Sequence, residues 1–331
     1  MALPFKVHMV MGITLWLGLT TLGISLGNQA IGFQHLWAAL NGDQILPHYE
    51  VILWNIRLPR TLMAGITGAG LAMVGATIQA MVRNPMADPW ILGVSSGASL
   101  GAVLAMTLGL ATSVALSTQA LAFIGAVVAS GLVYVFAARD QGLSSTRLIL
   151  VGLALSFLFG ALTQLAIFAA PHSAYLKSVL FWTLGSLGDI SLSSLVIPAI
   201  VTVATFILLL LKSEDLNLCL LGDEKAFSMG LSLQKLRRNL FFLCALTIAV
   251  LVAETGTIGF VGLIIPHLLR LMIGSDYRLL IPACFVYGGC FLMLADLGSR
   301  LLFNPEELPI GVLTAICGSP VLIYLLRRDL A

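Results

Sequence analysis

The sequence predicts an all-α polytopic membrane protein with about ten transmembrane helices and with both termini in the cytoplasm. Of its 331 residues, 59% are hydrophobic and only 10% are charged, whereas a soluble domain carries about 25% charged residues. A helix needs about 20 apolar residues to cross a bilayer. The runs of suitable composition are 9–27, 58–81, 91–111, 119–138, 147–169, 190–211, 240–257, 259–275, 279–300 and 308–326.

The positions of the seventeen Lys and Arg predict the orientation. With a cytoplasmic N-terminus, thirteen of them lie inside, and only Arg57, Arg60, Lys177 and Arg300 lie outside. Positive residues concentrate on the cytoplasmic side of membrane proteins. Both ends of the chain are basic, which favours an even number of spans.

The spans leave no room for a soluble domain, because the longest polar gap is 212–239. We therefore expect one transmembrane domain over residues 1–331. The apolar piece 177–187 is too short to cross, and it predicts a re-entrant or interfacial helix. It either lines a substrate route or places Phe181 and Trp182 at the membrane interface.

Small residues recur at every fourth position of three spans. Such stripes let helices approach closely in lipid, where packing drives association. We interpret them as helix–helix seams. They are Ala64, Gly68, Ala72, Ala76 and Ala80 in the second span, Gly97, Gly101, Ala105 and Gly109 in the third, and Gly311, Ala315 and Ser319 in the tenth.

A polar stretch, Arg83–Gly97, separates the second span from the third. Pro85 and Pro89 restrict Asn84 and Asp88 to extended or turn conformations, so the helix must stop there. Irregular backbone at membrane depth occurs only where protein buries it or where it lines a water-filled cavity. The stretch therefore predicts the floor of a pathway. Ser145 or Thr146 is expected to cap the fifth span, with a lining role beside Asn84 as the alternative.

The outer cations Arg57 and Arg60 stand three residues apart at the start of a helix, where the helix dipole disfavours them. They either anchor lipid headgroups or meet an acidic protein partner. Arg300 follows Asp296 by one helical turn, so an internal ion pair is its alternative role.

The inner gap 212–239 predicts two short helices, Asp223–Met229 and Ser232–Arg238, with Gly222 and Gly230 at their boundaries. The first helix would present Ala226, Phe227 and Met229. An exposed apolar surface on a polar loop is typical of a site that binds a protein partner. Packing against the inner ends of the spans is the alternative.

Several functions are excluded by missing residues. The chain has no G-x-x-x-x-G-K-[ST] loop for ATP, no catalytic constellation, and few of the intramembrane carboxylates of secondary transporters. The five Cys form no CxxC pair, so we expect no metal site and no bound cofactor. A pore driven by another subunit is therefore favoured over a stand-alone secondary transporter or a structural scaffold.

The motifs, taken together, resemble those of the FecCD-type permeases of type II ABC importers. They are Arg57-Leu58-Pro59-Arg60, Arg83 to Pro89 with Leu92 to Ala98, Phe260 to His267, Ala295-Asp296, and Glu307 to Thr314. The resemblance implies a multi-pass protein of the bacterial cytoplasmic (inner) membrane that is itself no enzyme and has no nucleic-acid partner. It implies a homodimer or a dimer with a paralogous permease, set in membrane lipid. It also implies a cytoplasmic ABC ATPase dimer, which uses ATP and Mg, and an extracytoplasmic substrate-binding protein.

By position, the resemblance also implies roles for individual residues. Arg57, Arg60 and Arg300 resemble the arginines that dock the binding protein. Asn84 and Met86 resemble one cytoplasmic gate, where relatives commonly have Leu in place of Met86, and Ser145 with Thr146 resembles the other. The coupling helices that enter the ATPase correspond to Leu221, Gly222, Asp223, Glu224, Ala226, Phe227, Met229 and Gly230.

The cargo expected from the resemblance is an iron complex, either a ferric siderophore or haem. Small and apolar cavity walls with few charges suit a bulky chelate better than a bare ion. Cobalamin and molybdate-type oxyanions are the alternative cargoes.

Overall fold

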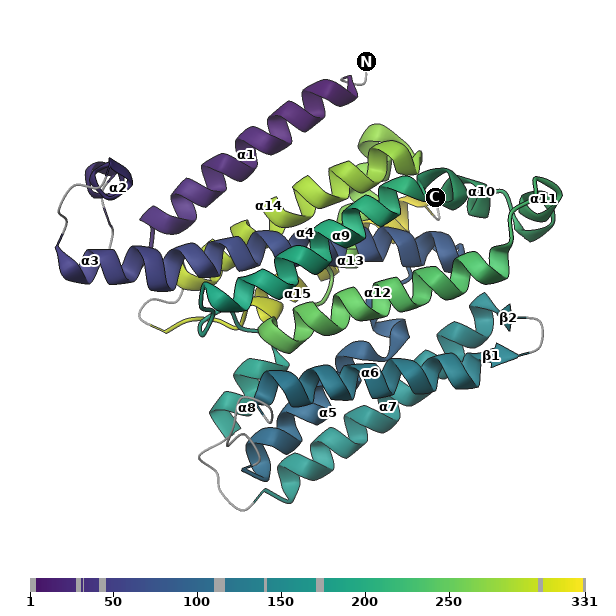
Figure 1. The fold of residues 1–331 in the computed structure, drawn as a ribbon, viewed down its shortest axis with the longest axis horizontal. Helices are drawn as coiled ribbons and strands as arrows, with labels where there is room; N and C mark the ends of the chain where they lie inside the picture. Colours follow the sequence, from purple (N-terminus) through teal and green to yellow (C-terminus); the bar gives the residue numbers. More distant parts are fainter. Residues whose placement is uncertain are drawn as a thin grey trace.

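The computed structural model describes residues 4–27, 31, 33–41, 46–109, 117–139, 142–170, 176–302 and 306–329. Their fold is all-α, with one two-stranded hairpin (Figure 1). Each predicted span overlaps one long α-helix of the described residues. These helices are α1 (Phe5–Ser25), α4 (Leu58–Val82), α5 (Val94–Thr107), α6 (Thr118–Ala137), α7 (Ser145–Phe168), α9 (Val196–Leu211), α12 (Leu233–Thr255), α13 (Val261–Ile273), α14 (Tyr277–Leu301) and α15 (Ile310–Asp329).

Seven helical segments of the described residues are long and apolar enough to cross a membrane. The helices α5, α13 and α15 are apolar but have a shorter apolar stretch. A helix rises 1.5 Å per residue, so the 13 residues of α13 cover only about two thirds of a typical hydrocarbon core.

The remaining elements are short. They are α2 (Phe33–Asn41), α3 (Pro47–Val51), the π-helix η1 (Ile52–Arg57), the 3₁₀ helices η2 (Pro89–Leu92) and η5 (Ser193–Leu195), α8 (Leu176–Thr183), α10 (Ser213–Leu220), α11 (Asp223–Ser228), and the strands β1 (Ala138–Arg139) and β2 (Gly142–Leu143). The predicted short helix within 177–187 is thus confirmed as α8.

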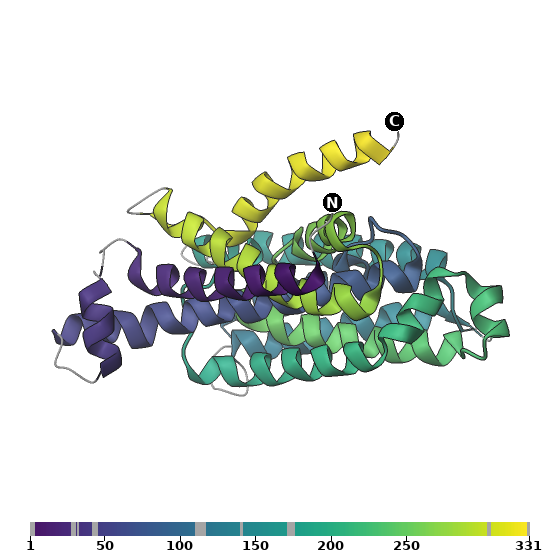
Figure 2. The same cartoon turned by 90° about the horizontal axis from the view of Figure 1, so that it is seen from above.

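The helices run roughly along one long axis (Figures 1 and 2). The elements α2, α3 and α8 lie toward one end of this axis, which we call the α3 end, and α10, α11 and the β hairpin lie toward the other, the α11 end. The start of α1 and the end of α15 both lie on the α11 side of the middle. The location of both termini in the cytoplasm stays a prediction.

Helix α4 is the centre of the packing, since nearly all of its side chains are buried. A Cβ on Gly68 would collide with the backbone of Gly288 in α14, and one on Gly75 with the backbone of Gly262 in α13. Gly97 of α5 approaches Gly125 of α6 in the same way. The contacts of Gly68 and Gly97 confirm helix–helix seams on the second and third predicted spans, because only glycine permits such close backbone contacts. The third-span stripe ends before Gly109, where a Cβ would meet no neighbour, and Gly311 of the tenth span lies against the Leu184 carbonyl.

The prediction of a separate helix at Ser232–Arg238 is wrong. These residues form the beginning of α12, with Ser232 as its N-cap residue. The chain contains no Gly or Pro from Leu233 to Thr255, so nothing ends the helix before it enters the span. The helix α10, which precedes α11, is an element that the sequence analysis did not identify.

Asp276 joins two of these elements at the α11 end. Its carboxylate caps α14 by accepting from the Arg278 N–H, and it accepts from Asn217 Nδ2 of α10 at 2.7 Å. The Arg278 side chain donates to the same carboxylate. Hydrogen bonds from Arg278 and Asn217 lower the pKa of Asp276 to about 2.

A lowered pKa in the folded state stabilises the protein at pH values above the ordinary pKa of 3.8, and this contribution is lost as the pH falls toward 2. Asn also caps helices well. We therefore expect Asp276→Asn to lower the unfolding free energy at neutral pH by only about 0.5–1 kcal/mol, the scale of exposed ion pairs. The difference in thermal midpoint between variant and wild type should shrink as the pH falls from 5 to 3. A difference that is constant with pH would contradict the role of the charge.

Candidate functional site

Helix α11 projects apolar side chains at the α11 end. Phe227 is 78% exposed, Met229 is 61% exposed and Leu221 is 50% exposed. Gly222 and Gly230 bound the helix with φ of +98° and +84°, values that suit glycine. Ala226 is fully buried, so the expectation that it is presented with Phe227 is wrong. We call Leu221, Phe227 and Met229 the α11 surface.

Asp223, at the start of α11, forms ion pairs with two arginines from distant parts of the chain. One carboxylate oxygen lies 2.9 Å from Arg237 Nη2 of α12 and 3.3 Å from Arg83 Nη2. Arg237 also donates to the Leu143 carbonyl of β2 at 3.4 Å. Because Arg83 follows the last residue of α4 and precedes Asn84, this carboxylate joins α11 to the predicted gate.

Residues 83–93, which we call the gate loop, are held by two side-chain turns. The Asn84 Oδ1 accepts from the Met86 N–H at 2.9 Å, and the Asp88 carboxylate accepts from the Trp90 N–H at 2.9 Å. Each of these residues precedes a proline, and Asn and Asp favour such turns. Burial raises the pKa of Asp88 to about 6.

The second predicted gate position lies beside the first. Ser145 Oγ donates to the Met81 carbonyl at the end of α4, at 3.4 Å. Ser145 and Thr146 line a cavity of about 360 Å³ together with Arg83, Asp223 and Arg237. The structure therefore brings both gate stretches to the base of α11. The expected capping role is wrong, because α7 begins after Ser144 and no side chain caps it.

A buried polar network beneath the gate loop was missed by the sequence analysis. Gln79 of α4, which is 2% exposed, directs Nε2 to the carbonyls of Ala87, Gly262 and Leu263 at 3.3–3.4 Å. The Gly262 carbonyl lacks its usual helical donor, because residue 266 is a proline without an N–H. Gln79 thus joins the gate loop to α13.

The network continues toward α10. Arg270 of α13 donates to Gln79 Oε1 and to the Tyr277 hydroxyl, which itself donates to the Ala76 carbonyl at 2.9 Å. The Tyr277 N–H donates to Asn217 of α10 at 2.9 Å. One signal in the sequence was available, since Gln79 is a polar residue within an apolar span.

At the α3 end, the three predicted docking arginines are buried and engaged within the chain. Arg60 lies 2.7 Å from Asp296 and 2.7 Å from Glu307, and Arg300 lies 3.0 Å from Asp296. Arg57 donates to the carbonyls of Ile24 and Ser25. The internal pair of Arg300 with Asp296 is confirmed. The three arginines also line one cavity of about 340 Å³.

Metal binding finds no support in the described part of the chain, where no three His, Cys, Asp or Glu side chains come together. The chemistry of the site is therefore that of ion pairs, hydrogen bonds and an exposed apolar surface. Such a site can bind a protein and transmit a movement. The seven described helical segments that are long and apolar enough to cross a membrane define the class as a multi-pass membrane protein.

Comparison with known proteins identifies the family within this class. Residues 14–328 match the family model described as the FecCD transport family, and the chain belongs to that family. It is 36% identical over 308 residues to the hemin transport system permease protein HmuU of Yersinia pestis, covering 92% of this chain and 90% of that protein. It is 39% identical over 289 residues to the vitamin B12 import system permease protein BtuC of Klebsiella pneumoniae, covering 87% of this chain and 86% of that protein.

Comparison with solved structures supports the same family assignment. The chain superposes with a TM-score of 0.86 and 31% identity on a metal-chelate type ABC transporter in an inward-facing conformation, covering 97% of this chain and 98% of that one. The protein is therefore a membrane permease of the ABC importer class. The family counts against the alternative of a stand-alone secondary transporter, because these relatives are named as the permease proteins of transport systems.

Proposed function

We propose that this chain is the permease subunit of an ATP-driven, binding-protein-dependent importer for a metal chelate, either an iron complex or a corrinoid. Two copies would form the pathway, with the α11 end in the cytoplasm. The relatives support both cargo classes, since one is named for hemin and the other for vitamin B12. The observation that carries the proposal is the shared carboxylate of Asp223, which pairs with Arg83 beside the gate loop.

In the proposed mechanism, the partner ATPase holds the α11 surface, so its closure moves α11. Asp223 passes this displacement to Arg83 and hence to Asn84 and Met86. The same displacement reaches Arg237 and the Ser145–Thr146 stretch, because these residues line one cavity with Asp223. Two gate stretches would therefore move together when α11 moves.

At the α3 end, we propose that the binding protein inserts an acidic side chain into the cavity lined by Arg57, Arg60 and Arg300. Among the described residues, three arginines and the carboxylate of Glu307 line this cavity. Guanidinium groups bind carboxylates through strong, charge-assisted hydrogen bonds, so an acidic side chain of the partner suits the opening. The side chain of Glu307 is 38% exposed, so an incoming carboxylate can displace it from Arg60.

The central test is reconstitution. The tagged chain, its ATPase and its binding protein should together give ATP-dependent uptake of a metal chelate into lipid vesicles, at a rate that falls to background without any one of them. Uptake that proceeds without the ATPase would refute the proposal.

The proposed docking role predicts that replacing Arg57 weakens binding of the substrate-binding protein, and that the loss of affinity depends on salt. We expect Arg57→Gln to weaken binding of the substrate-binding protein by about ten-fold at low ionic strength and by less at high ionic strength, because salt screens charge attraction. Surface plasmon resonance at two salt concentrations measures this.

A matched control for Arg57→Gln is Lys177→Gln, which removes an exposed cation at the same end from a side chain that lies over the Phe181 ring. Equal thermal midpoints of wild type and variant would exclude misfolding. If Arg57→Gln binds as tightly as wild type at low salt, the docking role is wrong.

A further inference from the structure

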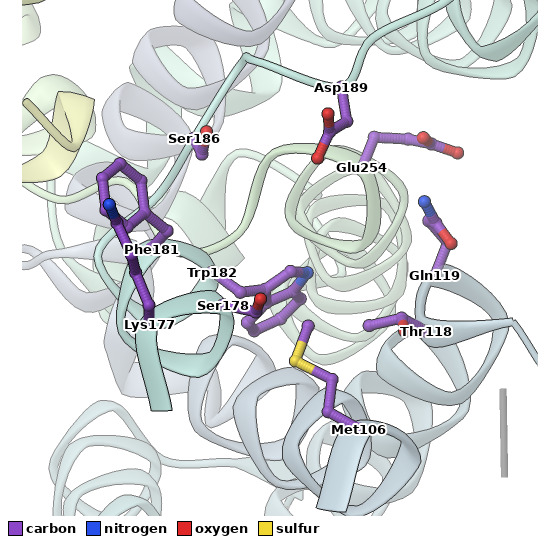
Figure 3. A pocket seen from close by; sticks show the side chains of 10 residues that line it. All are labelled: Met106, Thr118, Gln119, Lys177, Ser178, Phe181, Trp182, Ser186, Asp189 and Glu254. Carbon is purple, nitrogen blue, oxygen red and sulfur yellow. The ribbon is translucent and has the colours of Figure 1, made fainter. Parts of the chain in front are cut away.

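A cavity of about 460 Å³ opens at the α3 end between α5, α6, α8 and the end of α12 (Figure 3). This volume lies within the range of small-molecule sites. Glu254 and Trp182 are half-buried in its wall, whereas Asp189 is exposed at its rim. The lining residues are Met106, Thr118, Gln119, Lys177, Ser178, Phe181, Trp182, Ser186, Asp189 and Glu254.

The charges of this cavity are separated. Asp189 and Glu254 lie on one side together, whereas Lys177 lies on the other side, over the Phe181 ring (Figure 3). The Lys177 Nζ is 5.9 Å from the centre of that ring. Within the ranges that the structure describes, neither carboxylate forms an ion pair with a cation. The interior of the cavity is therefore negative on the Asp189 side.

The polar groups on the other walls are uncharged. Thr118, Ser178 and Ser186 carry hydroxyls, Gln119 carries an amide, and the indole of Trp182 lies between α8 and α12 (Figure 3). Carboxylates only accept hydrogen bonds. A ligand that presents N–H groups or a positive charge would satisfy them, and an aromatic face adds attraction for a cation.

Backbone hydrogen bonds between distant segments form one wall of the cavity. The Ser186 N–H donates to the Thr255 carbonyl at 2.9 Å, and the Gly185 carbonyl accepts from the Ile310 N–H at 3.0 Å. The α8 segment is thereby hydrogen-bonded to the end of α12 and to the start of α15. Gly256, with φ of +66°, lies against the Trp182 carbonyl, where a Cβ would collide. These backbone contacts hold the segment that carries Trp182 against the end of α12, which carries Glu254.

From this arrangement we propose that the cavity is a cargo subsite that takes the neutral or cationic, hydrogen-bond-donating edge of a metal chelate, such as its amide or amine groups. The inference rests on the proposed importer function and narrows its cargo. An anionic chelate would bring its carboxylates or phenolates against Asp189 and Glu254, and like charges at short range oppose binding. The cavity therefore selects against anionic complexes, haem with its two carboxylates included.

The test compares three water-soluble probes by equilibrium dialysis against the permease–ATPase complex in nanodiscs. They are a cationic ferric trihydroxamate, neutral amide-rich cyanocobalamin and a trianionic ferric tricatecholate. We expect the trihydroxamate and cyanocobalamin to bind more tightly than the tricatecholate. The double variant Asp189→Asn, Glu254→Gln removes both charges at nearly constant shape, and it should reduce the preference for the trihydroxamate over the tricatecholate by about ten-fold or more.

Glu50→Gln is the matched control, because it removes an exposed carboxylate at the same end but outside the cavity, and it should leave the preference unchanged. Equal preferences in wild type and double variant would overturn the inference, as would tighter binding of the tricatecholate or binding of no probe. Vesicle uptake is measured in parallel with the binding protein present. If ATP-dependent uptake persists while the preference is insensitive to the charges, the subsite is wrong and the importer function stands; if uptake requires no ATPase, the importer function itself fails.

Discussion

Phe227→Asp should abolish stable association of the ATPase and reduce coupled transport to background. The Phe227 ring is 78% exposed, so the substitution costs little folding free energy, whereas in the complex it would place a charge in an apolar contact. Loss of a central aromatic contact at an interface typically costs about 2–4 kcal/mol, or roughly 30- to 1,000-fold in affinity. Co-purification of the ATPase with the tagged chain measures this directly.

The same change at Leu302 is the control for Phe227→Asp. Leu302 is also an exposed apolar residue, at 63%, but it follows α14 at the α3 end, so Leu302→Asp should retain the ATPase. Ala226→Asp is a poor test, because Ala226 is fully buried and a charge there would disrupt the packing of α11 itself. If Phe227→Asp retains a stoichiometric ATPase and cargo-stimulated hydrolysis, the α11 surface is not the coupling site.

The parts of this fold that depend on local sequence could be predicted. Ten apolar runs predict ten helices because lipid forces each run to satisfy its own backbone. Gly222 and Gly230 locate the ends of α11 because both adopt positive φ. Asn84 and Asp88 form turns because each precedes a proline.

The features that the sequence could not predict depend on contacts between distant segments. The distribution of Lys and Arg along the sequence predicts that Arg60 lies at the outer surface. In the structure its side chain is buried by ion pairs with Asp296 and Glu307, which lie more than 230 positions away in the sequence. Ala226 is adjacent to an exposed ring and yet fully buried, which only the packing of α11 decides. The cavity beside Trp182 likewise depends on the loop from Gly185 to Asp189 meeting the ends of α12 and α15.

Two routes connect the α11 end to the gate loop. The first runs along the surface from Asp223 to Arg83, through an ion pair whose side chains are 48% and 41% exposed. Exposed pairs contribute little and are weakened by salt. The second runs from α10 through Tyr277 and Arg270 to Gln79, and it is largely buried. Because hydrogen bonds to a charged group are stronger than neutral ones, we infer that both routes are needed, and that the second holds the gate loop against α10 while the Asp223 pair moves it.

Gln79→Leu should therefore uncouple the transporter. Leucine has a similar size, but it leaves Arg270 without its amide acceptor and the Gly262 and Ala87 carbonyls without a donor. Loss of a hydrogen bond to a charged group costs about 1.5–3 kcal/mol, which corresponds to roughly a 10- to 150-fold change in a coupled equilibrium. We expect ATP hydrolysis to continue while cargo transported per ATP falls by about that factor, as measured in vesicles from simultaneous uptake and phosphate release.

Thr77→Val separates this effect from a general disturbance of α4. Thr77 is as buried as Gln79, but its hydroxyl donates only to the Met73 carbonyl of its own helix, at 2.8 Å. This variant should keep the wild-type ratio of transport to hydrolysis. Tyr277→Phe removes a hydroxyl from the middle of the same network and should shift the ratio in the same direction as Gln79→Leu. A Gln79→Leu transporter with normal coupling would show that the surface pair of Asp223 and Arg83 suffices to move the gate loop.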